Sequence, residues 1–238
     1  MNTKTKSGMG WSLHLGRWLG IDVYLHFTFL LLLAFIGLSH GMIGRSLEAA
    51  AGGVLFFGGL FLCVLLHEYG HALAARRYGI ATRDITLLPI GGVARLERMP
   101  EKPAQEFVVA LAGPAVNVII AIGLFVGLKL GGWWQPLHTL SANSGNLFER
   151  LLMANVFLVL FNLLPAFPMD GGRVLRAVLA TRMSRLRATE IAVTVGTVLA
   201  GLLLVGGLWL GRLGLILIAV VVWMLGRSEL AALRAEAE

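Results

Sequence analysis

The sequence predicts an all-α polytopic membrane protein of about six transmembrane helices, with a re-entrant β-hairpin after the second. Hydrophobic residues make up 57% of the 238 positions, charged residues make up only 14%, and the mean hydropathy is +0.80. Uncharged apolar runs recur along the chain, most of them close to the roughly 20 residues that a helix needs to cross a bilayer. This composition excludes intrinsic disorder, and a single cysteine excludes a disulfide-stapled secreted domain.

Six apolar runs are the expected spans. The sixth has only 14 residues, but an arginine at each of its ends could reach the membrane interface. No span is followed by enough polar sequence for a second domain, so residues 1–238 are expected to form one membrane-embedded domain. The six runs are Val23–Gly44, Ala49–Leu66, Phe107–Leu128, Leu151–Met169, Ile191–Gly211 and Leu213–Gly226.

The positive charges predict the orientation of these spans. With six crossings, 16 of the 20 lysines and arginines, including Lys4 and Lys6, lie on the side that holds both termini and the second and fourth loops. Positive residues gather on the cytoplasmic side of a membrane, so both termini are expected in the cytoplasm. The net charge of +7 is then a signal of topology in the cell membrane, and no nucleic-acid partner is expected.

The second run ends in an H-E-x-x-H motif, His67-Glu68-Tyr69-Gly70-His71. Residues four apart share one face of a helix, so both imidazoles can reach one cation and Glu68 can reach a water beside it. The motif lies about 13 Å along the helix from Arg76, at 1.5 Å per residue, and charged groups are costly at membrane depth. The alternative is a polar cluster that faces other helices and binds no metal.

A catalytic zinc site needs a third protein ligand. Asp170 is the candidate, because it follows the fourth run on the same side of the membrane as the histidines. Pro165 interrupts the helix before it, and Gly171 permits a tight backbone path. Irregular backbone at membrane depth must be buried in protein or face water, which suits a hydrated metal site. The residues alone leave open that Asp170 caps the helix that begins near Gly172.

Two further features are candidates for substrate contact. Asn162 could donate hydrogen bonds to a substrate carbonyl, although a bond between helices is equally consistent with its position. The segment Thr82–Leu96 predicts two short strands, which could dip into the membrane and hold a substrate as an added strand near Gly91 and Gly92. A plain cytoplasmic loop is the alternative for this segment.

These motifs together resemble the site-2 proteases, a family of intramembrane zinc metalloproteases. The likeness rests on the H-E-x-x-H span followed, in order, by Asn162-x-x-Pro165 and Asp170-Gly171-Gly172. Gly113-Pro114-Ala115-Val116-Asn117 resembles the family's G-P-x-x-N element, and Leu88–Gly92 resembles its glycine-bearing segment after the zinc helix. Gly16–Leu33 is similar to the start of the branch that contains the Bacillus-type sporulation protease.

The resemblance implies one zinc ion held by His67, His71 and Asp170, with Glu68 as the catalytic base. For Asn162 it supports a role facing the substrate. The substrate would be another membrane protein, such as a transcriptional regulator or its inhibitor, cut within or near its transmembrane segment toward the cytoplasmic side. Near-site structural roles are expected for Asn117, Pro165 and Gly171.

Two departures from many relatives concern regulation. The stretch Ile80–Glu106 has no room for an inserted PDZ domain, and the sequence shows no CBS domain, so control through either is not expected. The competing function is a non-proteolytic membrane protein that binds or transports metal. A transporter would spread ionisable groups along a path through several spans, whereas here they gather at one depth.

Overall fold

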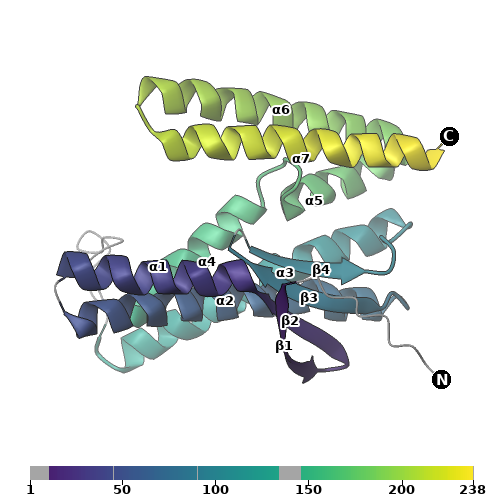
Figure 1. Ribbon diagram of the computed structural model, residues 1–238. Coiled ribbons are helices and arrows are strands. Elements are labelled where there is room, and N and C mark those ends of the chain that lie inside the picture. The colour runs from purple at the N-terminus through teal and green to yellow at the C-terminus, as the bar shows by residue number, and fades with distance from the viewer. Residues whose placement is uncertain (1–10, 45, 90, 134–145, 238) are drawn as a thin grey trace. The chain divides into compact units, whose positions relative to one another are not determined.

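A computed structural model of the chain describes residues 11–44, 46–89, 91–133 and 146–237 (Figure 1). Lys4 and Lys6, used above for orientation, lie outside these residues. The described chain is mostly helical and includes a four-stranded sheet. It divides into two compact units, and the division falls inside helices α3 (Pro103–Leu130) and α4 (Leu147–Asn162). The first unit is Met1–Arg98 with Val116–Phe157, and the second is Met99–Ala115 with Leu158–Glu238.

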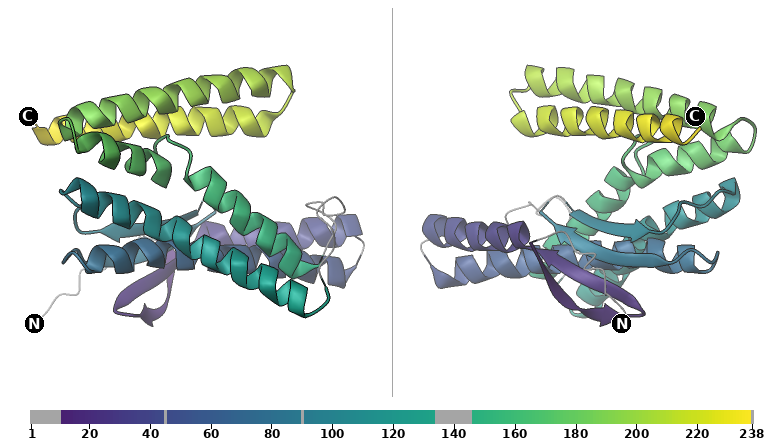
Figure 2. Two further views of the ribbon diagram at one scale, coloured as in Figure 1. Left: turned by 180° about the vertical axis from the view of Figure 1, so that it is seen from behind. Right: turned by 45° about the vertical axis from the view of Figure 1, so that its right-hand side comes forward.

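The sheet belongs to the first unit and has the strand order β1-β2-β3-β4 (Figure 2). β1 (Ser12–Trp18) and β2 (Ile21–His26) form one antiparallel hairpin. β3 (Thr82–Leu88) and β4 (Gly91–Leu96) form the other, and β2 pairs with β3 in parallel. The two strands predicted after the second span are therefore present, and they occupy the stretch in which no PDZ domain was expected.

The expectation of a mostly helical fold is confirmed, but the fold is not all-α, because a first hairpin that was not predicted adds two strands to the four-stranded sheet. The expected span Val23–Gly44 is also wrong at its start, since its first four residues belong to β2 and helix α1 begins at Phe27 and ends at Gly44. The burial of β2 alternates along Ile21, Val23 and Leu25, which is the pattern of a strand with one covered face. In the sequence this pattern continues from Val23 into the apolar helix without a charged residue between them.

Helix α2 (Leu47–Arg76) supports the sheet. Val23 is fully buried against Tyr69 and Ala72 of this helix and Ile85 of β3. The same helix packs on α1 near its middle, where Phe29 and Phe61 meet edge to face with ring centroids 4.3 Å apart. The metal-binding motif is thus on the helix that has both the sheet and α1 packed on it.

Two hydrogen bonds attach the turn between β1 and β2 to the end of α2. The Tyr69 hydroxyl donates to the Trp18 carbonyl at 3.1 Å, and the Arg76 guanidinium donates to the Leu19 carbonyl at 2.9 Å. Leu19 has a φ of 52°, so its carbonyl is presented by a left-handed turn residue.

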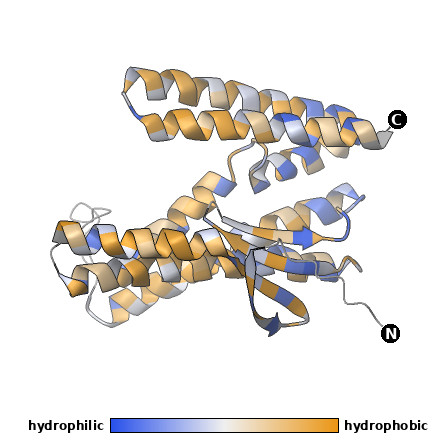
Figure 3. Cartoon of the chain, in the orientation of Figure 1, coloured by the Kyte–Doolittle hydropathy of each residue, from blue (hydrophilic) through white to orange (hydrophobic). Residues whose placement is uncertain are grey.

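The second unit contains α5 (Asp170–Ala180), α6 (Arg185–Trp209) and α7 (Leu213–Ala237). Helices α6 and α7 lie side by side in every view (Figures 1 and 2). Gly207 permits their close approach, because a Cβ there would lie 2.9 Å from Ile216. Hydrophilic residues gather where α6 begins and α7 ends (Figure 3), and there Arg234 is bonded to Glu190 at 2.8 Å.

Within the described residues, four helices are long and apolar enough to cross a membrane: α2, α3, α6 and α7. The sixth predicted run is therefore part of a longer helix than expected, since α7 continues to Ala237. The fourth run ends as a helix at Asn162, before Pro165 and Pro168. Helices α1 and α4 are shorter than these four, so six crossings remain a prediction.

Candidate metal centre

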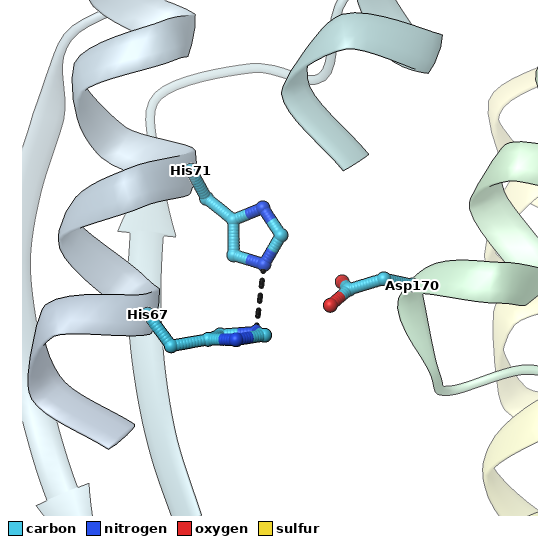
Figure 4. Close-up of side chains that lie close together, drawn as sticks. All are labelled: His67, His71 and Asp170. Carbon is cyan, nitrogen blue, oxygen red and sulfur yellow. Dashed lines mark hydrogen bonds between the residues drawn. The ribbon is translucent and has the colours of Figure 1, made fainter. Parts of the chain in front are cut away.

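His67 and His71 lie on one face of α2, as their spacing predicts. Their Nε2 atoms are 3.0 Å apart, and the two side chains are 6% and 5% exposed (Figure 4). Two imidazole nitrogens that converge in this way offer a pair of ligands to a metal ion from one turn of helix. The apolar run of α2 and its packing on the sheet hold this turn in place.

The second ring nitrogen of His67 contacts Asn117. His67 Nδ1 lies 2.5 Å from Asn117 Oδ1, and Asn117 on α3 is fully buried. This places the asparagine of the G-P-x-x-N element beside the metal motif, although the two are far apart in the sequence. A hydrogen bond at Nδ1 leaves Nε2 as the nitrogen available to a metal.

Asn155 on α4 continues this contact and was missed by the sequence reasoning. Asn117 Nδ2 donates to Asn155 Oδ1 at 2.8 Å, and Asn155 Nδ2 donates to the Leu151 carbonyl at 2.8 Å. Cys63 of α2 accepts a second bond from Asn155 at 3.3 Å. The available signal was an asparagine in the middle of an apolar run, where a polar side chain must find a partner.

Glu68 is half-buried and lies against strand β4. A Cβ at Gly92 would come within 2.6 Å of Glu68 Cγ and 3.2 Å of Val64 Cγ1. The absence of a side chain at Gly92 therefore allows β4 to pass directly beside the carboxylate of the motif. Gly91 has open space around its Cβ position but a φ of 137°, which other residues rarely adopt.

Asp170 is the first residue of α5, in the second unit, and is 6% exposed. The N-cap of this helix is Met169, so Asp170 does not have the capping position that was the alternative for it. A carboxylate in the first turn is stabilised by the helix dipole.

The glycines after Asp170 are required by close packing. A Cβ at Gly171 would lie 2.3 Å from the Leu164 carbonyl oxygen, and one at Gly172 would lie 2.7 Å from the backbone of Ala166. The loop after α4, which includes the exposed Pro165, therefore folds directly over the start of α5. Asn162, the last residue of α4, is half-buried just before this loop.

Arg176 holds α5 within the second unit. It was counted above as a loop charge, but it is only 1% exposed. Its Nε donates to Glu106 at 2.7 Å and its Nη1 donates to Glu229 at 2.8 Å, while its guanidinium lies 4.9 Å from the centre of the Phe167 ring. One side chain of α5 is thereby bonded to α3 and α7 and packed on the loop that precedes Asp170.

The sequence model of peptidase family M50 matches residues 55–132 and 134–204. The chain belongs to peptidase family M50. The match includes the H-E-x-x-H motif, both asparagines of the buried contact, and Asp170 with the glycines after it.

Two relatives are similar to this chain over much of its length. A zinc metalloprotease of Methanocaldococcus jannaschii is 39% identical over 222 residues, which cover 93% of this chain and 61% of that protein. Stage IV sporulation protein FB of Bacillus subtilis is 30% identical over 163 residues, which cover 68% of this chain and 49% of that protein. This M50 chain thus spans about half to three fifths of the length of these relatives.

A solved structure has the same fold. The site-2 protease from Methanocaldococcus jannaschii is 36% identical to this M50 chain, with a TM-score of 0.65, and the match covers 92% of this chain and 95% of that one. The fold expected from the resemblance to site-2 proteases is therefore confirmed in its coarse form, with apolar helices and a small sheet.

Proposed function

We propose that this M50 chain is an intramembrane zinc endopeptidase that hydrolyses a peptide bond of another membrane protein. The observation that carries the proposal is the convergence of His67 and His71 within a long apolar helix that also carries Glu68. The relative named as a zinc metalloprotease, which is 39% identical to this chain, supports the metal and the reaction class. A transporter would not need a carboxylate placed next to a ligand but left out of the ligand set.

The proposed metal ligands are His67, His71 and Asp170. All three side chains are buried, and each offers one ligand atom. Two imidazoles and a carboxylate form a typical donor set of catalytic zinc sites, and they leave a position open for substrate or water. The donor set therefore fits zinc, although ligand type alone does not exclude another divalent metal.

Proton transfer in the reaction is assigned to Glu68. Bound zinc would polarise the scissile carbonyl and make a water molecule acidic enough to lose a proton near neutral pH. Glu68 takes that proton as the water attacks and then donates it to the leaving amine, so the protons balance when the peptide bond breaks. Asn162 is proposed to donate a hydrogen bond to the carbonyl oxygen as negative charge develops on it.

The substrate segment is proposed to bind along β4. A helical substrate must unwind first, because its carbonyls are bonded within the helix. In the described sheet β4 is the edge strand, and Gly92 brings that edge against Glu68. A substrate added to this edge as a strand would present its backbone beside the proton-transfer group.

The cut is proposed to lie toward the cytoplasmic side of the cell membrane. The charge distribution from which both termini are expected in the cytoplasm also predicts that side for the end of α2 at Arg76. Cleavage at this depth would release the cytoplasmic part of a membrane protein, and a transcriptional regulator or its inhibitor is the proposed substrate class.

Metal content tests the proposed ligand set without a substrate. Protein purified in detergent without chelators should hold one zinc ion per chain in the wild type and in Glu68→Gln. Asp170→Ala should lose the metal, while Glu190→Gln, which changes an exposed carboxylate, should keep it. Wild-type protein without stoichiometric metal would contradict the protease proposal and favour transport or packing for the polar cluster.

Cleavage is the second test. Wild-type protein reconstituted with a panel of single-span substrates should release a cytoplasmic fragment, and Glu68→Gln should bind the same substrate without cutting it. Cleavage at the wild-type rate by Glu68→Gln would show that another group transfers the proton.

A further inference from the structure

Three buried side chains from three helices form a continuous chain of hydrogen bonds that ends at the metal motif. It runs from the Leu151 carbonyl through Asn155 and Asn117 to His67, with successive distances of 2.8, 2.8 and 2.5 Å. Both asparagines are fully buried. All of these residues belong to the first unit.

The direction of this chain is set at its far end. The Leu151 carbonyl can only accept a hydrogen bond, so the atom of Asn155 that faces it must be the amide nitrogen. The Asn155 oxygen then faces Asn117 and accepts from its amide nitrogen. The opposite orientation of Asn155 would place two acceptor oxygens 2.8 Å apart in a buried site, which is costly.

The orientation of Asn117 in turn determines which ring nitrogen of His67 carries the proton. With its amide nitrogen directed at Asn155, Asn117 presents its oxygen to His67. That oxygen can only accept, so His67 Nδ1 carries the proton and Nε2 carries the lone pair. The lone pair is on the nitrogen that faces His71 at 3.0 Å.

We propose that Asn117 and Asn155 are positioning residues that keep His67 in the tautomer and ring orientation needed to bind zinc. The inference rests on the proposed function, because it assigns the residues a task toward the metal. A buried partner on the second nitrogen of a ligand histidine typically accounts for about 10- to 100-fold in metal affinity. The backbone carbonyl of Leu151 is the fixed point of the arrangement, since no rotation of a side chain can reverse it.

Zinc affinity measured by competition with a chromophoric chelator tests this assignment. Asn117→Leu removes the acceptor and should weaken zinc binding by about 10- to 100-fold. Asn117→Asp keeps an acceptor for His67 Nδ1 and should restore most of the affinity, even though it places a carboxylate against the Asn155 oxygen and lowers the thermal stability. Asn155→Leu should weaken binding less than Asn117→Leu, because Asn117 loses its orientation but not its contact with His67.

A packing variant provides the control. Leu152 lies in the apolar contact between α3 and α4 together with Ala121 and Leu128. Leu152→Ala should lower the thermal stability and leave the zinc affinity unchanged. A loss of zinc affinity in Asn117→Leu that is absent in Leu152→Ala would therefore not be a general effect of lower stability. Wild-type affinity in Asn117→Leu, or equal losses in Asn117→Leu and Asn117→Asp, would overturn the assignment while the protease proposal stands. Wild-type protein that binds no zinc would overturn both.

Discussion

Gly92 of β4 lies directly against Glu68 of α2, with no space between them for a single methyl group. The position of the edge strand β4 and the position of the proposed catalytic base therefore depend on one another. A substrate strand on β4 would be aligned with the carboxylate by the backbone at this glycine, and a Cβ added here would meet Glu68 Cγ before any other atom.

Gly92→Ala should lower the cleavage rate by about 100-fold, the loss that follows when a catalytic group moves by about 1 Å. The zinc content should stay at the wild-type level, because Glu68 is not a ligand. Gly58→Ala is the control: Gly58 is on α2 with Glu68, and no described atom lies within 4 Å of the new Cβ. This variant should change neither the cleavage rate nor the zinc content. A wild-type cleavage rate in Gly92→Ala would mean that Glu68 is not held by β4.

Gly171→Ala should disturb the third proposed ligand. The added Cβ would meet the Leu164 carbonyl oxygen at 2.3 Å, so the loop and the start of α5 cannot both keep their places. We expect the zinc content to fall in parallel with that of Asp170→Ala. Gly201→Ala in α6, where no described atom lies within 4 Å, should keep full zinc content. Full zinc content in Gly171→Ala would separate the glycine from the metal site.

Arg176→Met should destabilise the chain by about 3–5 kcal/mol, because it leaves the buried Glu106 carboxylate without its cation. Arg234→Met removes the exposed ion pair with Glu190 and should cost about 1 kcal/mol or less. The two variants remove the same charge, so a difference between their unfolding free energies measures burial and not charge. Equal losses would show that the Arg176 pair is hydrated.

The predicted orientation can be tested with cysteine labelling, because Cys63 is the only cysteine in the sequence. In a Cys63→Ala background, Arg212→Cys should react with a membrane-impermeant maleimide added to intact cells, while Arg182→Cys should react only after permeabilisation. Both positions are exposed and lie three residues beyond the two ends of α6. The opposite labelling pattern would reverse the orientation and move the proposed cut to the other side of the membrane.

The candidate metal ligands could be proposed from the sequence because residues close to one another along the chain indicate them. His67 and His71 are separated by one helical turn, and Asp170 follows a proline that ends an apolar helix. Asn155 could not be predicted, since its partner Asn117 is on another helix and no local spacing connects the two. Burial of an amide in an apolar run was the one available signal.

The first hairpin was missed for a different reason. β2 alternates buried and half-buried positions over only six residues and is followed at once by the apolar helix α1. A short period-two pattern next to a long apolar run is read as part of that run. The pairing of β2 with β3 depends on residues about 60 positions apart, Val23 with Ile85 among them, which no local pattern encodes.

The parallel pairing of β2 with β3 joins the two hairpins into one four-stranded sheet. The proposed substrate-binding edge, β4, is thus already a strand without substrate, whereas a helical substrate would have to unwind. A strand edge recognises backbone groups, which all sequences share. Discrimination between substrates then falls on how readily each one leaves the helical state, where a glycine costs about 1 kcal/mol and a proline about 3 kcal/mol relative to alanine. On this proposal, selectivity among substrates depends on the stability of the substrate's own helix and less on its side-chain contacts with β4.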